Sequence, residues 1–169
     1  MKKNLVLTGM MGVGKSTVGQ DLATKLNLQF KDVDKIIEKK LSLSITDIFE
    51  KKGEGFFRKV EEEETLNYIK EKNVVVALGG GAFMNEKIRE NTKKLCISVW
   101  LDLEPKYLFP RIKMNKRRPL LNSKSSEQDV KNLYEKRKKI YSLADYKIDC
   151  NSKTRDEIVK EILKIYESI

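Results

Sequence analysis

The stretch that decides the fold is Gly9-Met10-Met11-Gly12-Val13-Gly14-Lys15-Ser16-Thr17, which follows the apolar run Leu5-Val6-Leu7. It fits the pattern G-x-x-x-x-G-K-[ST], in which a glycine-rich loop joins a buried strand to the start of a helix. Val18, Leu22 and Leu26 recur at helical spacing after the loop and indicate that helix. A strand, a glycine loop and a helix in this order predict a site that wraps the phosphates of a nucleotide triphosphate.

The residue types of this loop suit triphosphate chemistry. Glycines leave the backbone N–H groups open to phosphate oxygens, where side chains would obstruct the approach. Lys15 would supply a cation for the β and γ phosphates, and the Ser16 hydroxyl is placed to ligate a magnesium ion. We therefore expect ATP and Mg²⁺ as cofactors. The residues expected around the nucleotide are Gly12, Val13, Gly14, Lys15, Ser16 and Thr17.

Strand-like runs and helical patterns alternate along the chain. The strand-like runs are 4–8, 29–33, 74–78, 95–101 and 146–150. Such alternation predicts a parallel sheet, and the run 74–78, apolar on both faces, indicates helices on both sides. The expected fold class is α/β, with five parallel strands in a three-layer arrangement. No linker-like stretch divides the 169 residues, so we expect a single domain over 1–169.

The net charge of the chain and its distribution limit the kinds of partner that the protein could bind. The chain has 35 Lys and Arg against 25 Asp and Glu, a formal net charge of +10. The basic residues are interleaved with glutamate, apart from a dense patch at 113–118, and show no aromatic–basic alternation typical of RNA recognition. Anionic small substrates therefore explain the charge better than nucleic acid does. No apolar run approaches the roughly 18 residues of a membrane span, and no secretory leader is evident, so we expect a cytoplasmic protein.

The numbers of histidines and cysteines limit the chemistry that the chain can perform. Histidine is absent, which excludes histidine-based acid–base catalysis and leaves proton transfer to carboxylates. The two cysteines, Cys96 and Cys150, sit in apolar strand-like runs without the spacing of a metal site. Reduced thiols in the core are the expected state of both.

Candidate acceptor-site residues follow two of the predicted strands. The second ends in Asp32-Val33-Asp34, and carboxyl ends of parallel strands converge on the crevice where ligands bind. One carboxylate could hold magnesium and the other accept a proton, although both could instead cap the next helix. The third strand ends in Gly79-Gly80-Gly81, which either exposes backbone N–H groups to a ligand or is a mere turn.

Two arginines lie on separate predicted helices. Arg58 is followed three residues later by Glu61, which can orient its guanidinium group. Arg137 lies on a much later helix. Together the two guanidinium groups could clamp a carboxylate, whereas either one alone would be interpreted as a surface charge.

These motifs, taken in order, resemble the shikimate kinase family from end to end. The matching segments are the loop 9–17, the D-x-D pair in 30–34, G-E-x-x-F-R in 53–58, the glycine turn 78–82, R-P-L-L in 118–121, and the segment of Leu133, Arg137 and Tyr141. The phosphate loop is common to many families, but the ordered set is far more specific. The resemblance implies a P-loop kinase fold with a mobile lid at about 113–126, which transfers the γ-phosphoryl group of ATP to the 3-hydroxyl of shikimate.

The resemblance also implies a role for each site residue. Lys15, Asp34 and Arg118 would be catalytic, with Asp34 as the base, while Ser16 and Asp32 would hold magnesium. The residues implied at shikimate are Asp34, Arg58, Gly79, Gly80, Gly81 and Arg137, with Glu61 in support. Those implied at the nucleotide, besides the phosphate loop, are Arg111, Arg118 and Lys153.

Two alternatives stay open from the residues themselves. A gluconate-type kinase has a similar loop and fold, although G-E-x-x-F-R and the paired arginines favour a ring carboxylate. A nucleotide-dependent nucleic-acid-binding or regulatory protein would instead bind DNA or RNA tightly and in a salt-sensitive way. We expect a monomer with a small-molecule substrate and with neither a nucleic acid nor a membrane as partner.

Overall fold

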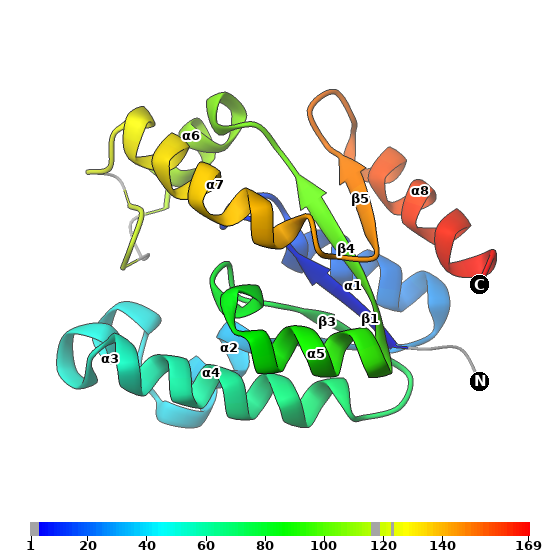
Figure 1. Cartoon of the computed structure of the whole chain (residues 1–169), viewed down its shortest axis with the longest axis horizontal. Helices are drawn as coiled ribbons and strands as arrows, with labels where there is room; N and C mark the ends of the chain where they lie inside the picture. The colour runs from blue at the N-terminus through cyan, green and yellow to red at the C-terminus, as the bar shows by residue number, and fades with distance from the viewer. Residues whose placement is uncertain (1–3, 116–118, 123) are drawn as a thin grey trace.

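Five parallel strands form one sheet in the computed structural model, which describes residues 4–115, 119–122 and 124–169 (Figure 1). The strands are β1 Asn4–Thr8, β2 Gln29–Asp32, β3 Val74–Ala77, β4 Cys96–Asp102 and β5 Tyr146–Asp149. Their order across the sheet is β2-β3-β1-β4-β5, and every neighbouring pair is parallel. The predicted five-stranded parallel sheet is thereby confirmed.

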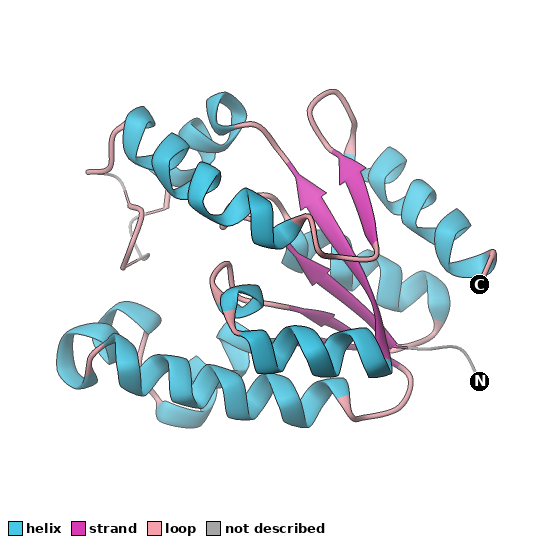
Figure 2. Cartoon of the chain, viewed as in Figure 1, coloured by secondary structure: helices cyan, strands magenta, loops and turns pink. Residues whose placement is uncertain are grey.

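Helices cover both faces of the sheet, which is the middle layer of the molecule (Figure 2). They are α1 Lys15–Leu26, α2 Val33–Leu41, α3 Ile45–Lys52, α4 Glu54–Ile69, α5 Glu86–Leu95, α6 Pro105–Lys113, α7 Glu127–Tyr141 and α8 Arg155–Glu167, with a short 3₁₀ turn at Ala82–Met84. Helices α1 and α8 pack together, and α5 contacts β4 while packing against α4. Right-handed crossovers between parallel strands explain why both faces are covered. A connection toward one edge of the sheet places its helix on one face, and a connection toward the other edge places its helix on the opposite face.

The strand order places a ligand crevice beside the phosphate loop. From β1 the chain crosses through α1 to β2, whereas from β3 it crosses through α5 to β4 on the other side of β1. The two connections diverge between β1 and β3, and in open parallel sheets ligands bind outside the carboxyl ends of strands at such a point. The loop after β1 and the glycine turn after β3 therefore begin at the same edge.

The core lies on the central strands. All residues of β1, β3 and β4 are buried, as expected for strands with helices on both faces. Cys96 and Cys150 are buried, 2% and 6% exposed, and neither forms a disulfide bond, which agrees with their prediction as thiols in the core. Among the described residues, no helix has both the length and the apolar character that crossing a bilayer would require.

One predicted boundary was wrong in a way that matters for the site. Strand β2 ends at Asp32, and Val33 already begins α2, so Asp34 lies in the first turn of a helix rather than at a strand end. The cause is a cap: the Asp32 side chain accepts a hydrogen bond from the Lys35 backbone N–H at 3.2 Å. Val33 is fully buried. All five predicted runs agree with the strands of the structure to within one residue at each end.

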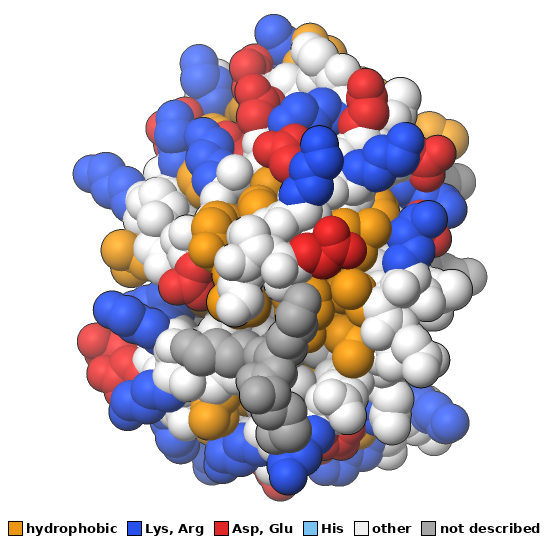
Figure 3. Space-filling view, turned by 90° about the vertical axis from the view of Figure 1, so that its right-hand side faces the viewer, with side chains coloured by type: hydrophobic (Ala, Val, Ile, Leu, Met, Phe, Trp, Pro, Cys, Tyr) orange, Lys and Arg blue, Asp and Glu red, His pale blue; other side chains and the backbone are white. Residues whose placement is uncertain are grey.

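Surface charge is spread rather than gathered on the face of the molecule drawn in Figure 3. Figure 3 shows Lys and Arg side chains there interspersed with acidic, uncharged and apolar ones. Of the lid predicted at about 113–126, Arg118 and its neighbours 116 and 117, and also residue 123, lie outside the described residues. The mobility of this segment stays a prediction.

Candidate active site

The phosphate loop has a backbone that only glycine adopts easily. Gly9, Gly12 and Gly14 have φ angles of 140°, 83° and 105°. A Cβ atom on Gly9 would lie 2.5 Å from the Leu101 carbonyl oxygen of β4, so a side chain at Gly9 would collide with the neighbouring strand. Gly14 caps α1, whose positive dipole end is thereby directed at the loop. The loop is built to receive an anion.

Lys15 places its charge inside this loop. The residue is 8% exposed, and its ammonium group donates hydrogen bonds to the carbonyl oxygens of Gly9 at 2.7 Å and Met10 at 2.9 Å. An ammonium group is a compact charge on a flexible stem, so it can turn from these carbonyls to phosphate oxygens that enter the loop. The residue predicted to supply a cation for the β and γ phosphates thus lies with its ammonium group inside the loop.

Ser16 and Asp32 form an oxygen pair beside the loop. The Ser16 hydroxyl donates a hydrogen bond to the Asp32 carboxylate, which joins the first turn of α1 to the end of β2. A hydroxyl and a carboxylate are hard oxygen ligands, and Mg²⁺ usually takes only one or two such ligands from protein, the rest coming from phosphates and water. The pair fits a magnesium ion shared with a nucleotide.

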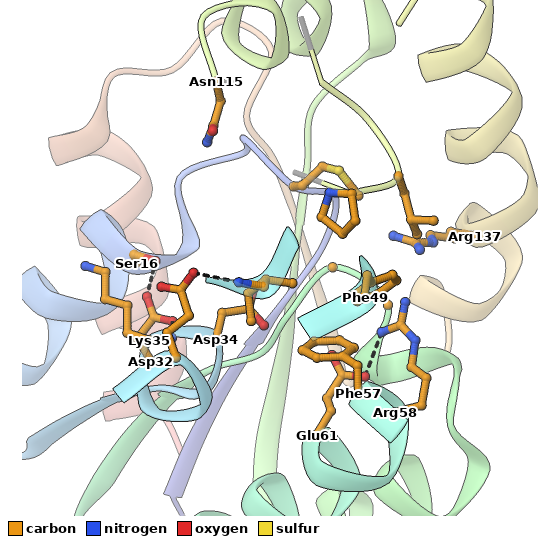
Figure 4. A pocket seen from close by; sticks show the side chains of 17 residues that line it. Ser16, Asp32, Asp34, Lys35, Phe49, Phe57, Arg58, Glu61, Asn115 and Arg137 are labelled. Carbon is orange, nitrogen blue, oxygen red and sulfur yellow. Dashed lines mark hydrogen bonds and ion pairs between the residues drawn. The ribbon is translucent and has the colours of Figure 1, made fainter. Parts of the chain in front are cut away.

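A cavity of about 300 Å³ runs from this pair to the two arginines (Figure 4). Asp34 lies between the two ends, and Gly80 and Gly81 of the glycine turn also line the cavity. The apolar part of its wall is made by Ile45, Phe49, Phe57, Pro119 and Leu120. Segments from both halves of the chain thus enclose one polar site with apolar walls, which is the usual form of a small-molecule site.

Arg58 is fixed from two sides on α4. Its guanidinium group donates to Glu61 Oε2 at 2.7 Å and lies 3.3 Å from Glu54 Oε1. The same group lies over the rings of Phe57 and Phe49, 5.2 and 5.9 Å from their centroids. Burial lowers the pKa of Arg58, but the neighbouring glutamates outweigh burial and raise it. The predicted orientation of Arg58 by Glu61, three residues later, is present in the structure.

Glu61 is an unusually buried carboxyl group. It is 2% exposed, and its Oε1 atom has no hydrogen-bond partner among the described residues. Burial raises the pKa of Glu61 to about 7, with a further increase from Asp34, while Arg58 and Arg137 oppose the rise. Near neutral pH this group is therefore poised between its charged and uncharged forms.

Arg137 reaches the cavity from α7 and is only 6% exposed. Its Nη1 atom is buried and has no hydrogen-bond partner among the described residues. A Cβ atom built on Gly80 would lie 3.3 Å from Arg137 Nη1, and one on Gly81 would lie 2.6 Å from Arg58 Nη1. The guanidinium groups of Arg137 and Arg58 therefore lie beside two adjacent residues of the glycine turn. A buried Nη1 donor without a partner among the described residues suits an anionic ligand.

The remaining predicted site residues differ in where they lie relative to the phosphate loop and the cavity. Arg111 on α6 donates to the carbonyl oxygens of Gly12 and Val13, both at 3.3 Å, so it touches the phosphate loop itself. Lys153 follows β5, pairs with Glu161 and does not line the cavity. Gly79 does not line it either, because its backbone lies behind side chains that do. Arg118 lies outside the described residues.

Sequence reasoning missed several residues of the cavity. Lys35, exposed on the first turn of α2, lines it beside Ser16 and Asp32 (Figure 4). Phe49 and Phe57 pack with ring centroids 4.9 Å apart and support Arg58. Phe49 and Phe57 both stand in the segment that resembles the family's substrate helix, 48–61, and could have been assigned to the site there, whereas no local signal marks Lys35 as a cavity residue.

Comparisons with known proteins agree with one another. The family model described as shikimate kinase matches residues 11–167. A shikimate kinase of Caldanaerobacter subterraneus subsp. tengcongensis is 40% identical over 164 residues, which cover 97% of this chain and 96% of that protein. The structure of shikimate kinase from Acinetobacter baumannii in complex with shikimate superposes with a TM-score of 0.94 at 36% identity, covering 99% and 94% of the two chains. That of the Aquifex aeolicus shikimate kinase gives 0.86 at 43% identity, covering 98% and 96%.

Proposed function

Because the chain belongs to the shikimate kinase family, we propose that it transfers the γ-phosphoryl group of Mg-ATP to the 3-hydroxyl of shikimate, giving shikimate 3-phosphate and ADP. The observation that carries this proposal is the pair of guanidinium groups on one wall of the cavity. Arg58 and Arg137 lie beside adjacent glycines, and Arg137 Nη1 has no partner among the described residues. A ring that carries one carboxylate and several hydroxyl groups matches such a wall.

The acceptor lies between the two charged ends of the cavity. Arg58, Arg137 and the backbone N–H groups at Gly80 and Gly81 hold its carboxylate, and Glu61 keeps Arg58 in place. Phe49 and Phe57 pack against the carbon face of the ring. The hydroxyl groups then lie toward Asp34, on the side of the phosphate loop.

The chemical step moves one proton and one phosphoryl group. The acceptor oxygen forms a bond to the γ phosphorus while the bond from that phosphorus to the β–γ bridging oxygen breaks, and ADP leaves. Asp34 accepts the proton of the attacking hydroxyl, a role that falls to a carboxylate in a chain without histidine. Phosphoryl transfer through a loose transition state depends on positioning and charge more than on covalent catalysis.

Positive charge on the transferring group comes from several sources. Lys15 turns from the loop carbonyls to the β and γ phosphates, and the first-turn N–H groups of α1 bind their oxygens. Ser16 and Asp32 would hold Mg²⁺, which would neutralise part of the charge of the phosphate groups. The resemblance in R-P-L-L assigns Arg118 a further contact to the γ-phosphoryl group.

The test is ADP formation from Mg-ATP with shikimate, gluconate or no acceptor, with the Asp34→Asn variant measured alongside. We expect turnover with shikimate only, and loss of that turnover in Asp34→Asn, which keeps the shape of the side chain but cannot take a proton. A folded protein that binds ATP and shows no shikimate-dependent turnover would overturn the proposal. Turnover with gluconate, or salt-sensitive binding of DNA or RNA with no acceptor dependence, would support the corresponding alternative.

A further inference from the structure

Tyr141, the last residue of α7, is the largest fully buried side chain among the described residues. Its ring stacks on Trp100 of β4, with centroids 5.9 Å apart and planes inclined by 30°. The ring is therefore held between the central sheet and a helix. A group that contacts the Tyr141 hydroxyl is therefore held in a fixed position relative to β4 and α7.

The Tyr141 hydroxyl donates a hydrogen bond to the Gly80 carbonyl oxygen. That carbonyl belongs to the peptide between Gly80 and Gly81, and the described residues contain no cis peptide bond. In a trans peptide the C=O and the following N–H point in opposite directions. A hydrogen bond that fixes the Gly80 carbonyl therefore also fixes the direction of the Gly81 N–H, on the opposite side of the same plane.

The same tyrosine is tied to the second arginine of the cavity. Arg137 lies one helical turn before Tyr141, on the same face of α7. A Cβ atom on Gly80 would lie 3.3 Å from Arg137 Nη1 and 3.2 Å from the Met11 backbone nitrogen. Gly80 is thus enclosed by the phosphate loop, Arg137 and Tyr141, and a shift of its carbonyl would move the anion-binding wall.

The hydroxyl group remains a donor under ordinary conditions. Burial raises the pKa of Tyr141 to about 12, while the charge of Arg137, its hydrogen bond to the Tyr141 side chain and the charge of Arg58 work in the opposite direction. The hydroxyl therefore keeps its proton across the neutral range. Its hydrogen bond to Gly80 is not a pH switch but a fixed support.

We propose that Tyr141 is a positioning residue for the acceptor: by holding the Gly80 carbonyl it presents the Gly81 N–H to the substrate carboxylate next to Arg137. The inference rests on the proposed function, since it concerns the carboxylate of shikimate. Under this proposal Tyr141 affects the binding of the acceptor and does not affect the binding of the nucleotide.

A matched control lies on the same helix. Tyr134 is also buried, at 5% exposed, and its hydroxyl donates to Asp102 Oδ1 at 2.8 Å, at the end of β4. Tyr134 does not line the cavity that holds Asp34 and the two arginines. Changing either tyrosine to phenylalanine keeps the ring and removes the hydrogen bond that its hydroxyl donates; Tyr141→Phe also removes the contact of that hydroxyl with Arg137. A merely structural role predicts that neither change acts selectively on shikimate.

The experiment compares Tyr141→Phe with Tyr134→Phe and with the wild-type protein. A lost hydrogen bond of ordinary strength corresponds to about a 3- to 10-fold change in an equilibrium constant. We expect the KM for shikimate to rise by about that factor in Tyr141→Phe only, with kcat and the KM for ATP within about twofold of wild type. Thermal unfolding of both variants establishes that they are folded.

Direct binding provides a second readout. Trp100 is the only tryptophan of the chain, and it stacks on Tyr141, so its fluorescence can follow titration with shikimate and, separately, with ADP. Weaker shikimate binding with unchanged ADP binding in Tyr141→Phe supports the inference. Equal KM values for shikimate in the two variants would overturn it while leaving the kinase activity intact. No shikimate-dependent turnover in the wild-type protein would instead remove the proposed function and the inference together.

Discussion

Asp34 and Glu61 converge on one point beside the backbone of Gly79. A Cβ atom built on Gly79 would lie 2.6 Å from Asp34 Oδ1 and 2.7 Å from Glu61 Oε1. The absence of a side chain at this position is what lets the two carboxyl groups approach each other. Because two like charges so close are costly, the proximity of Asp34 adds to the effect of burial on the pKa of Glu61.

Gly79→Ala is expected to disable the acceptor site. Its new methyl group would collide with both carboxyl groups, and displacement of either one misplaces the proposed base or the support of Arg58. We expect kcat/KM for shikimate to fall about 100-fold or more, since small displacements of reacting groups have effects of that size. Steady-state kinetics checks this, and an alanine variant with wild-type kinetics would show that the site tolerates the collision.

Gly55→Ala is the matched control for that change. Gly55 lies in the first turn of α4, and nothing stands within 4 Å of a Cβ atom built there. Alanine favours a helix over glycine by about 0.5–1 kcal/mol, so we expect unchanged kinetics and a melting temperature higher by about 1–4 °C.

Glu61 should make the stability of the protein depend on pH. Its pKa is raised from the ordinary 4.5 to about 7 in the folded state, so the folded protein holds this proton more tightly than the unfolded chain. The resulting contribution to the free energy of unfolding is complete below about pH 4.5 and is lost as pH rises through about 7. Its upper limit is about 3 kcal/mol. Melting temperatures between pH 5 and pH 8 should therefore fall less in Glu61→Gln than in wild type.

The glutamine variant separates this effect from other titrating groups. Glutamine keeps an oxygen that accepts a hydrogen bond from Arg58 but does not titrate. If the two proteins lost stability equally between pH 5 and pH 8, Glu61 would not be the group responsible.

Arg58→Ala should chiefly weaken binding of the acid. Hydrogen bonds to charged groups contribute about 1.5–3 kcal/mol, so the KM for shikimate should rise about 10- to 150-fold, with a small effect on the KM for ATP. Lys59→Ala is the control, because it removes the same charge from the adjacent, exposed position of α4 outside the cavity. Unchanged shikimate affinity in Arg58→Ala would exclude this arginine from the carboxylate clamp.

Lys15→Ala should act on the chemical step. Removal of a cation that stabilises the transferring phosphoryl group is expected to lower kcat about 100-fold or more. Lys25→Ala, at the exposed far end of the same helix, should leave kcat unchanged. Measuring kcat at saturating ATP and shikimate distinguishes a lost cation from weakened binding, and a Lys15→Ala variant with wild-type kcat would refute the assigned role.

Local patterns were enough to predict most of the fold. The runs 4–8 and 74–78 are apolar and bounded by glycine or polar residues, so the strands could be placed to within one residue. What the patterns misplaced was Asp34, which they put at a strand end, whereas the Asp32 side chain caps the next helix and Asp34 lies in that helix's first turn. Caps and strand ends draw on the same residue types, so the sequence alone does not separate them.

The site was predictable where its geometry is local. Arg58 and Glu61 are neighbours on a helix, and their spacing alone predicts their contact. The contacts of Gly79 with Asp34 and Glu61 depend on three segments that only the sheet brings together. The link from Tyr141 to Gly80 spans 61 residues and is equally a product of the tertiary structure.

The burial of Cys96 and Cys150 makes the folded chain a suitable background for labelling at a single chosen position. Thiolates react with alkylating reagents, whereas burial raises the pKa of the Cys150 thiol to about 12, and both cysteines are almost inaccessible. A cysteine introduced at Met114, which is 88% exposed and follows α6, would be the one reactive thiol of the native protein. A dye attached there would lie within the lid predicted at about 113–126, and its signal would test whether that segment moves during turnover.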